Sequence, residues 1–198
     1  MHVMRGCALA VGSLGLVALS VLPARAAEIT PAASEIAGGY SYLYDSDSST
    51  GLPAGWFFSA GASLSDTFSV VGDISGNYKS QSVVAGGATA SASMNVHTFL
   101  AGPRVSGRLS SGQMSFYGQF LVGAARASGG ATTTVGGTSF AVSASDTEFC
   151  FAPGAGVDIA LSDTGAIRAG VSERMIRANG NISKEFQLQL GLVYRFGR

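Results

Sequence analysis

Apolar and polar positions alternate strictly over residues 186–196. One face of this segment carries Phe186, Leu188, Leu190, Leu192, Tyr194 and Phe196, and the other carries Gln187, Gln189, Gly191, Val193 and Arg195. A period of two residues predicts a β-strand. Because the apolar face runs unbroken between aromatic residues while the other face ends in a charge, the pattern is typical of a barrel strand that faces lipid.

The same alternation predicts seven earlier strands. They span residues 35–44, 56–64, 68–78, 94–105, 114–127, 149–161 and 165–176. Such lengths suit tilted strands that cross a bilayer, which need roughly 9–11 residues each. An even number of strands places both chain termini on the same side of the membrane.

The connections between these strands fall into two groups. Three are short, at residues 65–67, 106–113 and 162–164, and four are mostly longer and rich in small or polar residues, at 45–55, 79–93, 128–147 and 177–184. Short periplasmic turns and longer outer loops are the usual arrangement. We therefore predict flexible loops at 79–93 and 128–147, with strand extensions at Phe140 and Val142 as an alternative in the second.

The first 26 residues have the composition of a signal peptide. Arg5 precedes an apolar run that ends at Leu22, and Pro-Ala-Arg-Ala follows at 23–26. The run is shorter than the roughly 20 residues that a transmembrane helix needs, so a membrane anchor is the weaker alternative. We predict a signal peptide at 1–26 and one domain at 27–198.

Composition narrows the fold and function further. Only 12% of residues are charged and 28 are Gly, and no long apolar run follows the signal, which excludes a helical membrane protein and disfavours a soluble α/β enzyme. Ten basic residues against twelve acidic ones remain after residue 26, which excludes nucleic acid as a partner. Cys150 is the only cysteine after the signal, so we expect a small packing residue rather than a disulfide or a reactive thiol.

Four stretches resemble the small outer-membrane β-barrel superfamily, which includes the OmpA transmembrane domain, OmpX-like proteins and opacity-type proteins. They are residues 38–43, 71–78 and 154–158, and the terminal pattern formed by Gln189, Gly191, Tyr194 and Phe196. The resemblance implies an all-β fold, an eight-stranded antiparallel up-and-down transmembrane β-barrel. It also implies a cell outer membrane location, and it makes the terminal pattern the signal read by the barrel assembly machinery.

An eight-stranded barrel has an interior just wide enough for side chains. Asp158 and Arg168 flank the turn at 162–164 symmetrically, and Glu35 and Arg195 lie on the first and last strands, so each pair is expected to meet across neighbouring strands. We predict a buried ion network in the lumen, because unpaired buried charges are costly; a conducting pore is the alternative. The candidates are Glu35, Asp73, Arg104, Asp158, Arg168 and Arg195.

Catalytic and metal-binding residues are not predicted. His97 is the only histidine after the signal, and the barrel family's lipid A deacylases pair a His with a Ser two residues later, whereas position 99 is Phe. One His and one Cys are too few for an ordinary transition-metal site. We expect no catalytic residue, no cofactor and no metal. Aromatic residues near the strand ends are expected to form interfacial girdles: Tyr40, Tyr42, Tyr44, Trp56, Tyr78, Tyr194 and Phe196.

The sequence favours a non-enzymatic outer-membrane protein that serves membrane integrity or surface interaction through its extracellular loops. The expected partners are outer-membrane lipid and lipopolysaccharide, and the assembly machinery during biogenesis; the expected state is a monomer. The alternatives are a narrow porin-like channel for small solutes, a lipid-modifying barrel enzyme and a secreted soluble β-sandwich.

Overall fold

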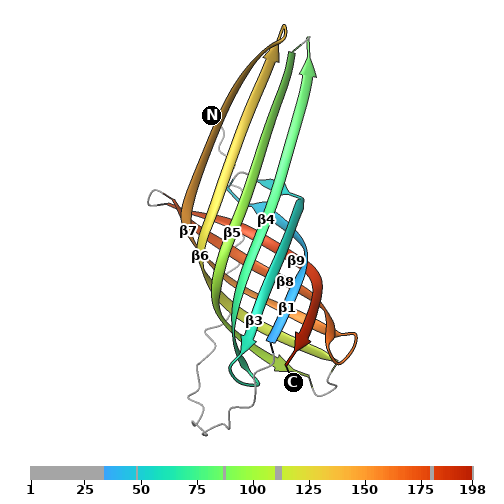
Figure 1. Ribbon diagram of the computed structural model, residues 1–198. Coiled ribbons are helices and arrows are strands. Elements are labelled where there is room, and N and C mark those ends of the chain that lie inside the picture. Colours follow the sequence, from blue (N-terminus) through green and yellow to red (C-terminus); the bar gives the residue numbers. More distant parts are fainter. Residues whose placement is uncertain (1–33, 48, 87, 110–112, 179–180, 198) are drawn as a thin grey trace, which may run out of the picture. The chain divides into compact units, whose positions relative to one another are not determined.

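A computed structural model describes residues 34–47, 49–86, 88–109, 113–178 and 181–197 (Figure 1). The predicted signal peptide, residues 1–26, lies outside the described residues. Within the described part of the chain, no helix is long and apolar enough to span a membrane.

In the described part of the chain, nine strands form a single antiparallel sheet. Their bounds are β1 Ser34–Asp45, β2 Thr50–Leu52, β3 Ala54–Ser63, β4 Phe68–Ala85, β5 Ala88–Arg108, β6 Met114–Val135, β7 Thr138–Ala160, β8 Gly165–Ala178 and β9 Asn181–Phe196. Long strands that follow one another in the chain pair with each other, and β1 also pairs with β9, so the sheet closes on itself (Figure 1). The predicted eight-stranded up-and-down barrel is confirmed. β2 is a short addition that pairs with the end of β1, inside the region predicted as a polar turn.

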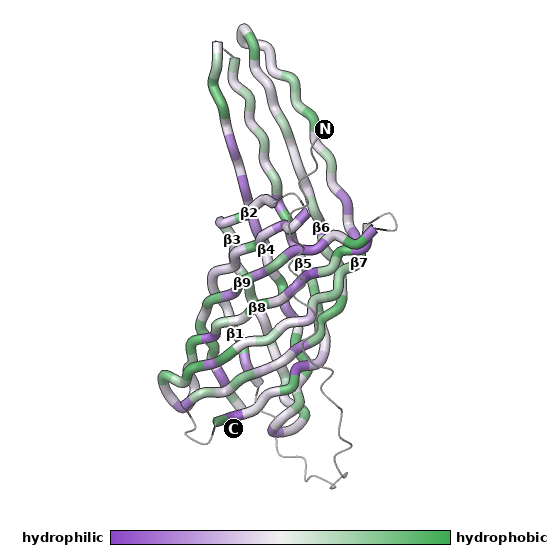
Figure 2. Tube along the Cα trace, turned by 180° about the vertical axis from the view of Figure 1, so that it is seen from behind, coloured by the Kyte–Doolittle hydropathy of each residue, from purple (hydrophilic) through white to green (hydrophobic). Residues whose placement is uncertain are grey.

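The alternation in the sequence separates the outer surface of the barrel from its interior. On β9, Leu190 and Leu192 are 57% and 63% exposed, whereas Gln187 and Val193 are 2% and 3% exposed. Hydrophobic and hydrophilic residues alternate in the same way along the barrel strands in Figure 2. A continuous apolar exterior of this kind is unfavourable in water and is stable when lipid surrounds it.

The barrel interior is filled by side chains. Apolar groups gather around Val71, Leu100 and Leu121, and a smaller group lies around Phe57 and Val193. Near the extracellular end, a third cluster packs across the lumen; its members are Leu43, Leu52, Val96 and Met94. We take the end with the short turns as periplasmic, following the usual asymmetry of these barrels.

The prediction of flexible loops at 79–93 and 128–147 is wrong, whereas the alternative of strand extensions at Phe140 and Val142 is confirmed, because both residues lie on β7. β4 and β5 remain paired up to Ala85 and Ala88, and β6 and β7 remain paired up to Val135 and Thr138. Gly136 and Gly137 both have positive φ, as the tight hairpin between β6 and β7 requires. Small residues have low strand propensity, but pairing with neighbouring strands outweighs it here.

The predicted loop at 177–184 is also mostly strand. β8 continues to Ala178 and β9 begins at Asn181, with Arg177 paired to Ile182. The polar residues in this segment suggested a loop, yet they alternate and pair across the two strands. The connection between β8 and β9 is therefore much shorter than the sequence indicated.

Candidate functional site: the polar lumen and the protruding sheet

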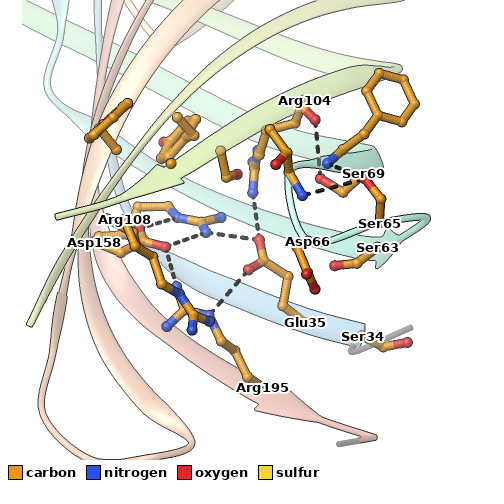
Figure 3. A pocket seen from close by; sticks show the side chains of 18 residues that line it. Ser34, Glu35, Ser63, Ser65, Asp66, Ser69, Arg104, Arg108, Asp158 and Arg195 are labelled. Carbon is orange, nitrogen blue, oxygen red and sulfur yellow. Dashed lines mark hydrogen bonds and ion pairs between the residues drawn. The ribbon is translucent and has the colours of Figure 1, made fainter. Parts of the chain in front are cut away.

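A dense ion network occupies the periplasmic half of the lumen (Figure 3). Arg168 forms a bidentate pair with Asp158, with Nε–Oδ1 and Nη2–Oδ2 distances of 2.8 Å each. Arg168 Nη2 also donates to Glu35 Oε1 at 2.8 Å. Asp158 and Arg168 are cross-strand partners on β7 and β8, so adjacent strands hold this pair in register.

Two further arginines complete the network. Arg195 Nη2 lies 2.5 Å from Asp158 Oδ2, and Arg104 Nη1 lies 2.5 Å from Glu35 Oε1. Arg195 and Glu35 are cross-strand partners at the β1–β9 seam that closes the barrel. Three guanidinium groups thus share two carboxylates, and the network links strands that are far apart in the sequence.

Tyr117 and Gln119 from β6 support the arginines. The Tyr117 ring lies 4.4 Å from Arg104 Cζ and 4.9 Å from Arg168 Cζ, measured to the ring centroid. Gln119 Oε1 accepts from Arg104 Nε at 3.0 Å and from Nη2 at 2.8 Å. Cation–π contacts and a side-chain amide therefore offset part of the cost of burying the excess positive charge.

The cavity beside this network is small. It measures about 110 Å³ at the periplasmic mouth, and Asp66 and Arg108 also line it (Figure 3). That volume holds small solvent molecules or an ion but not a lipid or a sugar. The arrangement therefore suits the structural bracing of a closed barrel better than chemistry on a substrate.

Asp73 is the one candidate that lies apart from the other five. Its carboxylate accepts from Gln189 Nε2 at 3.3 Å, toward the extracellular side of the network. Gln189 is one of the four residues of the predicted assembly signal. Of the other three, Tyr194 and Phe196 stack on the outer surface, and Gly191 pairs with Gly39 at the barrel seam.

A second polar group, which the sequence reasoning missed, lies above Asp73. Arg174 is fully buried, and its Nη2 donates to Ser75 Oγ at 2.6 Å, while Ser75 and Thr98 share a hydrogen bond of 2.7 Å. Glu185, which is buried too, is the cross-strand partner of Arg174. Arg174 follows Arg168 by six residues and so shares its face, a signal that could have found it.

His97 lies on the outer surface and not in the lumen. Its Nε2 is 3.0 Å from the Tyr78 hydroxyl, which also accepts a hydrogen bond of 3.1 Å from Trp56 Nε1. Phe99 follows on the same face and is 58% exposed. Among the described residues, no group of three or more His, Cys, Asp or Glu side chains could hold a metal ion.

Four strands continue beyond the barrel as a protruding sheet, defined here as residues 79–85, 88–94, 129–135 and 138–148 of β4 to β7 (Figure 1). Cross-strand partners in antiparallel strands share a face. One face continues the lumen side of the barrel and is mainly apolar. Its base carries the charged residues Lys79, Asp146 and Glu148, and beyond them it carries Gln81, Val83, Ala85, Ala88, Ala90, Ala92, Ala131, Thr133, Val135, Thr138, Phe140, Val142 and Ala144.

The opposite face of the protruding sheet is covered with hydroxyl groups. A shallow hollow on this face is lined by Ser80, Ser82, Ser91, Ser93, Thr132 and Ser143, among others. No charged residue lies within 80–93 or 128–145. Figure 2 shows the same trend, since the strongly hydrophilic residues gather below the tips of these strands.

Both edges of the protruding sheet are open in the described part of the chain. β3 pairs with β4 only as far as Tyr78, and β8 pairs with β7 only from Phe149. The backbone of residues 79–85 and 138–148 therefore presents unpaired hydrogen-bonding groups to an incoming strand.

The closed sheet, the lipid-facing exterior and the filled lumen together define a small outer-membrane barrel. The family model described as "Outer membrane protein beta-barrel domain" matches residues 14–196. The chain belongs to this family, and its place is the outer membrane, as the sequence predicted.

Solved structures of small outer-membrane proteins share the fold. Ail, the attachment invasion locus protein of Yersinia pestis, was solved with the heparin analogue sucrose octasulfate. It is 20% identical with a TM-score of 0.56, over 83% of this chain and 99% of that one. Neisserial surface protein A is 14% identical with a TM-score of 0.50, over 84% and 97% of the two chains. No curated protein sequence matches this chain.

Proposed function

We propose that this protein is a non-enzymatic surface-interaction protein whose protruding sheet docks a partner protein. The observation that carries the proposal is the uncovered apolar face of that sheet. Val83, Phe140 and Val142 are 65%, 68% and 72% exposed, on strands that rise beyond the lipid-covered barrel. An exposed apolar surface outside the membrane is an unusual feature that marks interaction sites.

The open edges favour a protein partner over a soluble small molecule. An extended segment can add to residues 138–148 of β7 through backbone hydrogen bonds, with its side chains contacting the apolar face. This edge is longer than the one on β4, so it offers more backbone groups for pairing. The structure of Ail contains a sulfated ligand, but residues 80–93 and 128–145 of this chain carry no charge, so the outer part of the protruding sheet offers no cations for a polyanion.

Two features support a role without catalysis or transport. The lumen is filled by the ion network and by the cluster of Leu43, Leu52, Val96 and Met94. His97 has Tyr78 as its hydrogen-bond partner, and among the described residues no hydrogen bond joins it to a nucleophile or a carboxylate of the kind hydrolysis needs.

Adhesion of bacteria that display the protein tests the proposal. Wild-type cells are expected to adhere to a surface coated with mixed serum proteins more than to a polysaccharide-coated surface. The double variant Phe140→Ser with Val142→Ser is expected to lose that gain. The matched control, Ser139→Ala with Ser143→Ala, changes neighbouring positions on the hydroxyl face and should keep it.

Folding is checked for every variant by gel mobility in SDS with and without boiling, since a closed barrel migrates differently before heating. Equal adhesion of the two double variants, or no gain on the protein-coated surface for the folded wild type, would refute a docking role for the apolar face.

A further inference from the structure

The outer surface of β4 to β7 changes character abruptly at one level. Ile74, Phe99, Ala124 and Phe149 are successive cross-strand partners and form an apolar row. The next outward-facing row toward the extracellular side consists of Gly76, His97, Arg126 and Thr147. This step marks the boundary between the acyl chains and the headgroups of the outer leaflet.

Three basic side chains meet this boundary, two from the neighbouring strands β5 and β6 and one from β8. His97 and Arg126 are cross-strand partners on β5 and β6, and Arg177 on β8 is the partner of Phe149. Arg126 is the partner of Thr147 and Arg177 is the partner of Phe149, so the two arginines lie on either side of β7 and are offset by two residues along it. Neighbouring strands lie about 4.8 Å apart. Both long side chains can therefore reach the same headgroup. We call His97, Arg126 and Arg177 the boundary patch.

Charge is segregated between the two faces at this level. Asp146 and Glu148 alternate with Thr147 on β7, so they lie on the lumen-side face, away from Arg126. Arg126 and Arg177 are exposed and form no ion pair with another described residue. This contrasts with the lumen, where Arg104, Arg168 and Arg195 all contact carboxylates.

His97 is oriented by its neighbours. Trp56 Nε1 can only donate, so the Tyr78 oxygen accepts from it and keeps its own proton for His97 Nε2. The proton of neutral His97 then lies on Nδ1, which makes no hydrogen bond to another described residue. The boundary patch thus has two guanidinium groups and one imidazole N–H donor that are not used by another described residue.

We propose that the boundary patch binds a phosphate group on the headgroup of an outer-leaflet lipid, whose acyl chains lie against Phe99 and Phe149. Guanidinium groups bind phosphate oxygens in bidentate fashion. The adjacent apolar row favours an amphiphile over a free anion, because only an amphiphile contacts both surfaces at once. The proposal is independent of docking by the protruding sheet.

Native mass spectrometry of the folded protein in detergent tests this site. The probes are diphosphorylated lipid A, the same lipid with its phosphates removed, and inorganic phosphate as a competitor. The wild type is expected to retain the diphosphorylated lipid and to release the dephosphorylated one. Arg126→Ala or Arg177→Ala is expected to lower the retained fraction roughly three- to tenfold, the effect of losing charge-assisted hydrogen bonds at an exposed site.

Lys79→Ala is the matched control. Lys79 lies close to the same level on β4, but on the lumen-side face. Its substitution removes one positive charge, as in the arginine variants, and should leave retention of the lipid unchanged. Equal retention of both lipids, or an equal loss in Lys79→Ala, would refute the site. Complete displacement by millimolar inorganic phosphate would show a site for a free anion and overturn the assignment to lipid.

Discussion

Asp158 is the most heavily used carboxylate in the lumen. It pairs with Arg168 and Arg195 and is only 4% exposed. Asp158→Ala leaves two arginines short of a partner, so we expect the free energy of unfolding to fall by about 3–5 kcal/mol, as for other broken buried pairs. The measurement is the urea midpoint of the barrel reconstituted in lipid vesicles.

Glu173→Gln is the control for that change. Glu173 pairs with Lys184 at 3.3 Å on the outer surface, where both side chains are half exposed. An exposed pair contributes about 1 kcal/mol or less. A loss in Asp158→Ala no larger than in Glu173→Gln would contradict the bracing role of the network.

The residues of the network were largely accessible from the sequence, but their grouping was not complete. Asp158 with Arg168, and Glu35 with Arg195, follow from hairpin symmetry and from closure of the barrel. Arg174 was missed because Glu173 precedes it on β8. When two adjacent residues are both charged, the alternation of the sequence does not show which of them faces the lumen. The burial of Arg174, and of its cross-strand partner Glu185 on β9, shows that Arg174 faces the lumen.

At the scale of strands, the seam between β1 and β9 requires close backbone contact. A Cβ atom added to Gly191 would meet the Gly38 carbonyl oxygen at 2.4 Å and the Phe57 ring at 2.8 Å. We expect Gly191→Ala to reduce the fraction of protein that closes into a heat-modifiable barrel. Gly118→Ala, where an added Cβ meets nothing within 4 Å, should fold like the wild type; equal yields would show that the seam can adjust.

The four long strands predict a distinct pattern of amide hydrogen exchange. Amides of β5 and β6 at residues 88–93 and 129–135 have neighbours on both sides and should be protected. On the open edges, at 79–85 and 138–148, only alternate amides pair inward, so protection should alternate. Amide exchange measured by NMR in nanodiscs checks this pattern. Uniformly fast exchange across all four segments would show that they are flexible loops, as the sequence suggested, and not strands.

Strand existence was predictable where large apolar residues mark one face, as over 186–196. It was not predictable over 79–93, and over 128–147 only Phe140 and Val142 indicated it, because Ala, Gly and Ser differ too little in hydrophobicity for either face to stand out. The alternation is nevertheless present, because Ala90 and Ala92 lie on one face and Ser91 and Ser93 on the other. Register with the neighbouring strands, which a single sequence does not reveal, turns this weak pattern into strands.

For the molecule as a whole, membership of the barrel family defines the location and the architecture, while the lumen and the protruding sheet distinguish the possible roles. Only the lumen concerns transport. Its periplasmic half contains the ion network, and its extracellular end contains the apolar cluster of Leu43, Leu52, Val96 and Met94. An ion would have to cross both.

We therefore expect no steady ion conductance when the protein is inserted into a planar bilayer. Arg104→Ala shortens a side chain that contacts Glu35, Gln119 and Tyr117, but it leaves the apolar cluster in place, so it should remain silent. Combining Arg104→Ala with Leu43→Ser and Val96→Ser removes packing at both barriers and should produce a measurable leak. Steady conductance of the wild type that changes in Arg104→Ala alone would instead support the narrow channel, because the network would then line an open path.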